Sequence, residues 1–131
     1  MKDEVYKMVK KTEIKTLTGL LKSLKSSIQE VEASSVVSVD GFMLASALPQ
    51  TTHKERVAVM SAAIHSLGET AARELGRGEL SEVYVKGENG SVVVIPSGKN
   101  AVLTTLTKAD NGSDSVSQDM KRTADEVAKL V

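Results

Sequence analysis

Residues 33–47 read Ala-Ser-Ser-Val-Val-Ser-Val-Asp-Gly-Phe-Met-Leu-Ala-Ser-Ala, and this stretch decides the fold class. Residues 33–39 and 42–47 are two strand-like runs, and Asp40-Gly41 separates them. An Asp-Gly pair between such runs is a strong signal for a β-hairpin, because glycine adopts the positive φ of a tight turn without strain. The stretch therefore predicts two antiparallel strands joined by a short turn.

Three further strand-like runs follow in the second half of the chain. Residues 82–87 alternate polar and apolar side chains, residues 91–95 are nearly all valine, and residues 101–106 end the series. Asn89-Gly90 marks the turn between the first two runs, and Pro96-Ser97-Gly98 begins the turn that leads to the last. Because short turns join antiparallel neighbours, we expect all five strands to lie in one antiparallel sheet.

Segments with the apolar spacing of a helix flank both groups of strands. Apolar residues recur every three or four positions over residues 14–31, 53–75 and 116–131, which indicates three amphipathic helices. The order helix, two strands, helix, three strands, helix predicts an α+β fold, a central five-stranded antiparallel sheet covered by the helices. We assign residues 12–131 to this single domain and residues 1–11 to an N-terminal extension.

The central helix carries two different kinds of side chain. Thr52 and Glu55 match a capping box at its start, and Gly76 stands where a helix stop belongs. Its larger apolar residues recur along one stripe: Val57, Met60, Ile64, Leu67, Ala71 and Leu75. The other sides carry mostly small residues, among them Ala58, Ala62, His65, Glu69 and Ala72. Small side chains allow a second helix to approach closely, but alanine is also the best helix former, so the pattern alone leaves both interpretations open.

Composition excludes several classes of protein. The chain of 131 residues contains no cysteine, which excludes a disulfide scaffold, a thiolate metal site and cysteine catalysis. A formal net charge of zero argues against a dedicated nucleic-acid binder, and an aromatic content of 2% leaves little for base stacking. We find neither an apolar run of membrane-spanning length nor a signal peptide, so we expect a soluble, cytoplasmic protein.

The motifs of enzyme chemistry are missing from the sequence. His53 and His65 lie twelve positions apart on one predicted helix, about 18 Å along its axis, and cannot share a metal. His65 and Glu69 are one helical turn apart, which we interpret as a surface hydrogen bond. Gly98-Lys99 lacks the remaining residues of a phosphate-binding loop. We therefore expect no catalytic residue, no metal and no cofactor, and an interaction module fits better than an enzyme.

Several segments together resemble a known family. Residues 40–46, Asp-Gly-Phe-Met-Leu-Ala-Ser, look like the first hairpin of Roadblock (dynein light chain) domains. Residues 92–98, Val-Val-Val-Ile-Pro-Ser-Gly, followed by residues 101–103, Ala-Val-Leu, resemble the later strands, and the capped helix lies between them at the expected distance. The resemblance covers residues 13–131 and is carried by the order and spacing of these motifs.

The resemblance implies a profilin-like fold and a homodimer. In such dimers the third strands pair into one continuous sheet, and the central helices lie side by side on one face. Transferred to this chain, the paired edge would contain Glu82, Val83, Tyr84, Val85 and Lys86. The helix residues near the partner helix or the GTPase-binding face would be Ala58, Ala62, His65, Glu69 and Ala72. Elementary physics agrees about the edge, because an exposed regular strand is a template for pairing and two-fold symmetry is the commonest way to satisfy it.

Two functions follow as expectations from the resemblance. The two-helix platform of the family commonly engages small Ras-like GTPases, and some relatives act as GTPase activators by ordering the GTPase's own catalytic residues. The first hypothesis is therefore a homodimeric adaptor or regulator of a small GTPase. The second is a structural dimer within a larger assembly without any GTPase contact. A small-molecule sensor, with a pocket under the hairpins, is a third and more remote alternative.

Overall fold

The computed structural model describes residues 11–108 and 114–131, so that residues 1–10 of the expected extension lie outside the described residues. The elements are α2 (Lys11–Ser27), β1 (Val31–Ser38), β2 (Met43–Ala47), α3 (Lys54–Glu74), β3 (Val83–Gly87), β4 (Gly90–Ser97), β5 (Ala101–Lys108) and α4 (Asp114–Ala128). Their order and type confirm the predicted α+β fold with a five-stranded sheet.

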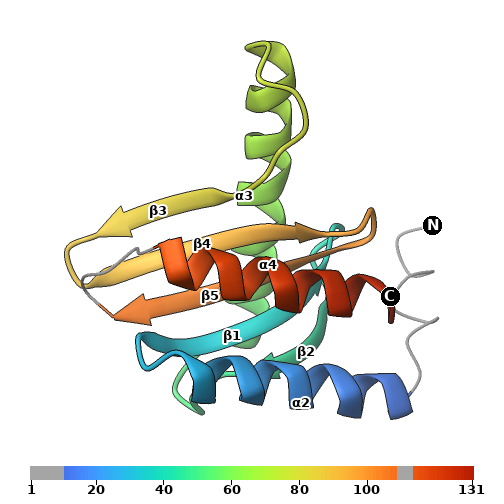
Figure 1. The fold of residues 1–131 in the computed structure, drawn as a ribbon, viewed down its shortest axis with the longest axis vertical. Helices are drawn as coiled ribbons and strands as arrows, with labels where there is room; N and C mark the ends of the chain where they lie inside the picture. Colours follow the sequence, from blue (N-terminus) through green and yellow to red (C-terminus); the bar gives the residue numbers. More distant parts are fainter. Residues whose placement is uncertain (1–10, 109–113) are drawn as a thin grey trace.

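Among the residues that the structure describes, the sheet is antiparallel throughout and has two open edges. The strands lie in the order β2-β1-β5-β4-β3, so the first hairpin and the last three strands join where β1 pairs with β5 (Figure 1). In the register of that central pair, Val36 lies opposite Leu103 and Val37 opposite Val102. The two strands at the edges are β2 and β3.

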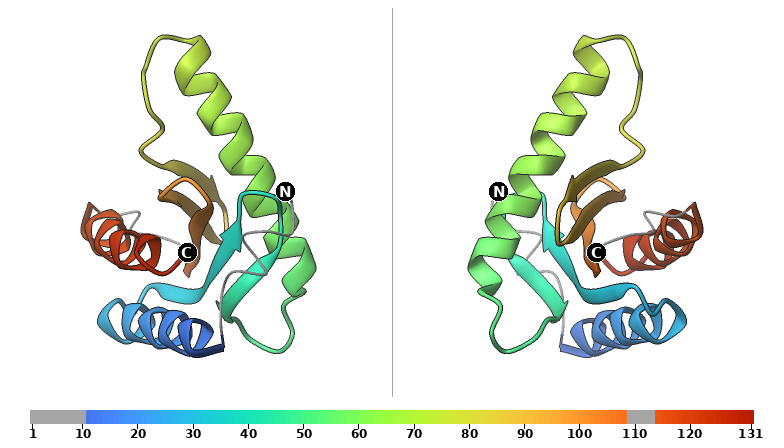
Figure 2. Two further views of the ribbon diagram at one scale, coloured as in Figure 1. Left: turned by 90° about the vertical axis from the view of Figure 1, so that its right-hand side faces the viewer. Right: turned by 90° about the vertical axis from the view of Figure 1, so that its left-hand side faces the viewer.

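The helices form two unequal layers on the sheet. Figure 2 shows α2 and α4 on one face and α3 alone on the other. The larger core cluster lies under α2 and α4 and includes Leu17, Leu21, Val36, Leu103 and Met120, all at 0% exposure. The cluster under α3 has four buried members: Val37, Ala58, Val94 and Val102. Burial of apolar surface stabilises the fold roughly in proportion to its area, so α2 and α4 contribute most of the core.

The first hairpin turn forms as its sequence predicts. Gly41 has a φ of 95°, a value that favours glycine, and its N–H donates to the Ser38 carbonyl at 2.9 Å. The Ser38 N–H donates to the Phe42 carbonyl at 2.8 Å, and the Phe42 N–H donates to the Ser38 hydroxyl at 3.0 Å. These bonds satisfy the backbone at the turn and set the register of β1 against β2.

One predicted helix end and one predicted helix cap are wrong. The first helix ends at Ser27, and Val31, expected at the end of its stripe, opens β1 instead. The N-cap residue of α3 is His53 and makes no side-chain capping bond, so the predicted capping box starting at Thr52 does not form. The Thr52 N–H donates to the Pro49 carbonyl at 3.0 Å, which places Thr52 in the turn that precedes the helix. Gly76, with a φ of 71°, ends α3 as predicted.

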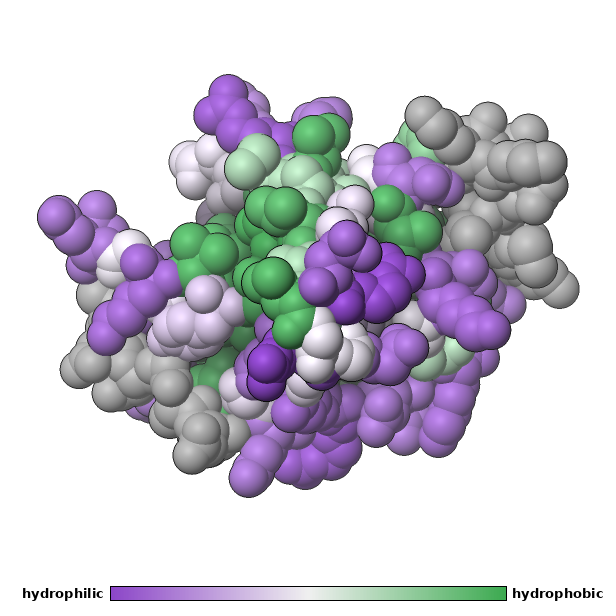
Figure 3. All heavy atoms as spheres, turned by 90° about the horizontal axis from the view of Figure 1, so that it is seen from above, coloured by the Kyte–Doolittle hydropathy of each residue, from purple (hydrophilic) through white to green (hydrophobic). Residues whose placement is uncertain are grey.

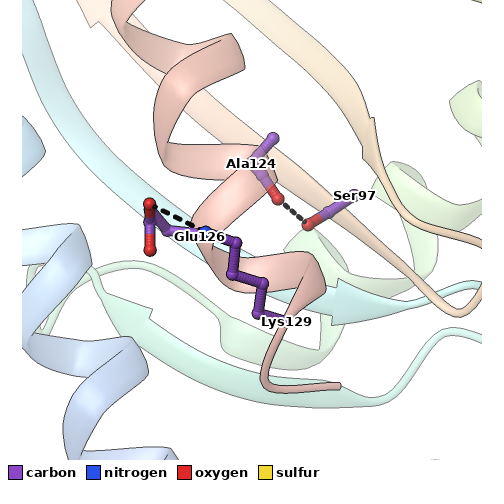
Figure 4. Close-up of polar contacts among 4 residues, drawn as sticks. All are labelled: Ser97, Ala124, Glu126 and Lys129. Carbon is purple, nitrogen blue, oxygen red and sulfur yellow. Dashed lines mark hydrogen bonds and ion pairs between the residues drawn. The ribbon is translucent and has the colours of Figure 1, made fainter.

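A buried hydrogen bond fastens α4 to the sheet. The Ser97 hydroxyl donates to the Ala124 carbonyl at 2.5 Å, between the end of β4 and the middle of the helix (Figure 4). Glu126, on the same helix, pairs at 3.4 Å with Lys129, which follows the end of the helix, and both side chains are exposed (Figure 4). A buried bond of the first kind contributes measurably to stability, whereas an exposed ion pair contributes little.

Candidate functional site

Helix α3 turns its small side chains toward the sheet and its large apolar side chains toward solvent. Ala58 and His65 are only 2% and 7% exposed, and Ser61 is buried beside them. Met60 and Leu67 are 54% and 73% exposed. Sequence periodicity places Met60 and Leu67 on a stripe that would normally be buried, and for these two residues that expectation is wrong. This orientation of α3 is the feature from which the candidate site is built.

Close packing explains why the small face points inward. A Cβ added at Gly68 would lie 2.6 Å from a methyl carbon of Val83, so the helix backbone approaches β3 too closely for a larger residue. The inner face is also polar, since the Thr104 hydroxyl donates to the Ser61 hydroxyl at 2.8 Å. Large apolar side chains on this face would keep the helix away from the sheet.

The outward-facing residues form what we call the outer stripe: Met60, Ile64, Leu67 and Ala71, of which Ile64 is half-buried and the others are exposed. Gly68, one helical turn from both Ile64 and Ala71, lies against Val83 of β3, so the stripe lies on the β3 side of the helix. Its spacing of four, three and four residues is that of a helix–helix seam. Leu75, 70% exposed, continues the apolar surface at the C-cap of α3.

The helix residues predicted to face a partner lie in different environments. Ala58 and His65 face the chain's own sheet and have almost no surface left for a partner. Ala62 and Ala72 are half-buried, and Glu69 is exposed. The prediction that His65 forms a hydrogen bond at the surface is wrong, because His65 is buried. Its Nε2 atom lies 3.8 Å from Oε2 of Glu69.

Edge strand β3 carries the predicted strand residues on two faces. Val83 packs under α3, and Val85 on the same face is 46% exposed. Tyr84 and Lys86 point to the opposite face, where the Ser91 hydroxyl donates to the Tyr84 hydroxyl at 3.1 Å. Glu82 precedes the strand, and one of its carboxylate oxygens accepts a hydrogen bond from Ser117 of α4 at 2.8 Å. The alternation of faces is therefore as the sequence predicts.

Strand edge and outer stripe form one continuous surface. The C-terminal half of α3 projects beyond the sheet above β3 (Figures 1 and 2). From above, apolar side chains gather around this projecting end (Figure 3). A free strand edge beside an exposed apolar patch is a protein-binding surface by its physical character. Periodicity could find the stripe, but the side of the helix on which it lies depends on the tertiary packing.

The described ranges contain a solvent-open hollow beside β2. This hollow of about 670 Å³ runs along β2 between α2 and α3, lined by Ile14, Met43 and Val59 among others. No group of three or more histidine, aspartate or glutamate residues there lies close enough together to hold a metal ion. Within residues 11–108 and 114–131, we find no helix with the length and hydropathy needed to cross a bilayer.

Comparisons with known proteins identify a family for the sequence and similar folds among solved structures. The family model of the Roadblock/LC7 domain matches residues 17–107. An uncharacterized protein of Methanocaldococcus jannaschii is 33% identical over 100 residues, which cover 76% of this chain and 87% of that protein. The solved structure of MglB with a tetrameric arrangement matches with a TM-score of 0.84 and 18% identity, over 94% of this chain and 93% of that one. Profilin II of Acanthamoeba castellanii matches with a TM-score of 0.61 and 14% identity, over 86% of this chain and 97% of that one.

Proposed function

The chain belongs to the Roadblock/LC7 domain family, and from this premise we propose that it is a homodimeric adaptor that binds a small Ras-like GTPase in the cytoplasm. Residues 12–131 form the domain, and residues 1–11 are an extension to it. The protein contributes no catalytic residue of its own to the GTPase reaction. It forms a platform on which the GTPase's own switch segments become ordered.

The observation that carries the proposal is the outer stripe of α3 beside the open edge of β3. Met60 and Leu67 are apolar and exposed, and they belong to the stripe that flanks Gly68, the residue of α3 that lies against Val83 of β3. When two copies pair along β3, two-fold symmetry brings the two α3 helices together on one face of a continuous sheet. The two outer stripes then cover one another, which removes apolar surface from water and stabilises the dimer.

A second side of α3 remains for the GTPase. Arg56, Val59 and Thr70 are exposed, and Val59 borders the hollow along β2, at the other end of the sheet from β3. In the dimer these side chains, once from each copy, form the upper surface of a two-helix platform. A protein that contacts the ordered switch segments binds the GTP-bound state more tightly than the GDP-bound state, and this difference in affinity is the source of any regulation.

Oligomeric mass and nucleotide dependence test the proposal. Light scattering on a size-exclusion column should give about twice the monomer mass over a hundredfold range of concentration. Immobilised dimer should then retain small GTPases loaded with a non-hydrolysable GTP analogue and release them when they carry GDP. The Val59→Ala variant should weaken retention without changing the mass of the dimer. A monomer at every concentration would refute the dimer.

The alternative of a structural subunit uses the same dimer surface. A stable dimer that retains GTPases equally in both nucleotide states, or retains none, would refute the GTPase-binding function. It would leave the protein as a dimeric scaffold of a larger assembly. The Val59→Ala variant separates the two, because a scaffold that uses only the stripe and the strand edge does not depend on this side chain.

A further inference from the structure

The sequence around edge strand β3 is symmetric about Tyr84, except that the residues at its two ends carry opposite charges. Residues 82–86 are Glu-Val-Tyr-Val-Lys, so an acidic and a basic residue stand at equal distances on either side of Tyr84, and two valines lie between. Two copies of such a segment are complementary to each other when they run antiparallel, because each end then meets a side chain of opposite charge.

The structure places these five residues on the two faces as such a pairing requires. Val83 and Val85 lie on the face covered by α3, where Val83 packs against the core cluster. Tyr84 and Lys86 lie on the face of α4, and Glu82 is tied to that face through the Ser117 hydroxyl. A carboxylate has two oxygens and accepts several hydrogen bonds, so this tie leaves Glu82 able to meet a lysine. No strand pairs with the outer side of β3 in the part of the chain that the structure describes.

Two-fold symmetry restricts how two β3 strands pair. Directly opposed residues in an antiparallel sheet lie on the same face, and neighbours along a strand lie on opposite faces. A two-fold axis perpendicular to the sheet must therefore pass through one residue of β3, which faces its own copy, and never between two residues. The exposed residues of β3 that carry a side chain are Tyr84, Val85 and Lys86, and the registers compared are those centred on each of them.

Side-chain chemistry separates these three registers. A centre at Lys86 sets two ammonium groups against one another, which is unfavourable. A centre at Val85 sets Val83 against Gly87 and brings Glu82 beside Glu88, a pair of like charge.

A centre at Tyr84 leaves every side chain of the segment with a suitable neighbour. It places Glu82 of each copy opposite Lys86 of the other, Val83 opposite Val85, and the two Tyr84 rings together. Opposite charges, apolar pairs and aromatic pairs directly across a sheet are all stabilising.

We propose that β3 pairs with β3 of a second copy in the register centred on Tyr84, with a Glu82–Lys86 pair on each side of the axis and two Val83–Val85 pairs on the α3 face. This inference rests on the proposed dimer and specifies its contacts. The match is between two identical segments, so the edge selects a copy of this chain over a relative that lacks the inverted charges. Val85, 46% exposed in the single chain, is covered in the dimer.

Charge reversal at each end of the segment tests the register. Glu82→Lys and Lys86→Glu should each weaken the dimer about tenfold, since symmetry converts two attractive pairs into two repulsive ones. The doubly exchanged variant Glu82→Lys/Lys86→Glu should recover the wild-type dissociation constant. An equimolar mixture of the two single variants should form mostly mixed dimers, because both cross-strand pairs are attractive only in the mixed species. Native mass spectrometry measures this fraction directly.

Single cysteines provide an independent measurement of the register. The chain has no cysteine of its own, so each variant carries one thiol. Opposed Cα atoms in such a sheet lie about 5.5 Å apart, within the range of a disulfide, and a residue off the axis lies too far from its own copy. Tyr84→Cys should form a disulfide dimer on mild oxidation, and Val85→Cys and Lys86→Cys should form little.

The outcomes distinguish this inference from the proposed function. Wild-type protein that stays monomeric would overturn the proposed dimer, and the register with it. A wild-type dimer in which Val85→Cys or Lys86→Cys crosslinks fastest would overturn the register alone. A dimer that is insensitive to both charge reversals, with no preference for mixed dimers, would also overturn it while leaving dimerisation through α3 in place.

Discussion

Truncation of Leu67 to alanine is the sharpest test of the outer stripe. Leu67 is 73% exposed, so in a single chain it makes few contacts, and its removal leaves the monomer core intact. A buried methylene is worth about 0.8 kcal/mol, and the substitution removes three carbons. We scale this value by the exposed fraction of Leu67 and take the dimer to bury the side chain completely. The substitution then weakens dimerisation by about 1.8 kcal/mol for each copy, or about 3.5 kcal/mol for the symmetric dimer.

A loss of that size raises the dissociation constant of the dimer about 300-fold. Sedimentation equilibrium over a wide concentration range measures the change. Val59→Ala is the matched control, because Val59 is also apolar, lies on the same helix, and is 59% exposed on a different side. It should shift the constant less than threefold, whereas burial of this side chain in the dimer would give a shift of about twentyfold. Equal effects of the two substitutions, or none for Leu67→Ala, would refute the assignment of the stripe to the dimer.

Three further predictions concern the stability of the single domain. Gly68→Ala should lower the free energy of unfolding by about 1–3 kcal/mol in urea titrations, because its Cβ would lie 2.6 Å from Val83. Gly19→Ala, also within a helix but with nothing within 4 Å of the new Cβ, should raise it by up to about 1 kcal/mol, and a loss at this position would contradict the packing argument. Ser97→Ala should lower the free energy of unfolding by about 1–3 kcal/mol, because the buried hydrogen bond to α4 is lost. Lys129→Ala should change it by less than about 0.5 kcal/mol, because the ion pair with Glu126 is exposed, and equal effects of the two substitutions would contradict this argument.

Most of the fold could be predicted from local signals. Asp40-Gly41 fixes a turn because glycine there takes a positive φ, and the strands on either side follow from their composition. The first helix was placed correctly except at its end, where Val31 continues the helical spacing and yet belongs to β1. Apolar spacing at three residues does not distinguish a last helical turn from the first residue of a buried strand. The boundary is decided by the pairing of β1 with β5.

The candidate site could be predicted only in part. The strand residues around Tyr84 alternate between faces as expected, since this depends only on the pleat of a strand. The helix residues Ala58 and His65 were expected toward a partner and lie against the sheet. Helical periodicity identifies the faces of a helix but not the neighbour of each face, because a stripe that covers the chain's own sheet and one that covers a second chain have the same spacing.

The element order, the turns and the inverted charges on either side of Tyr84 follow from the amino-acid sequence, because each is a local property of consecutive residues. Packing between distant parts of the chain determines that α3 approaches the sheet with its small face and leaves Leu67 exposed. The reason is the close fit at Gly68, which no property of the helix in isolation reveals. It also decided that β3, and not one of its neighbours, is left with an open edge, because strand order depends on contacts between residues far apart in the chain.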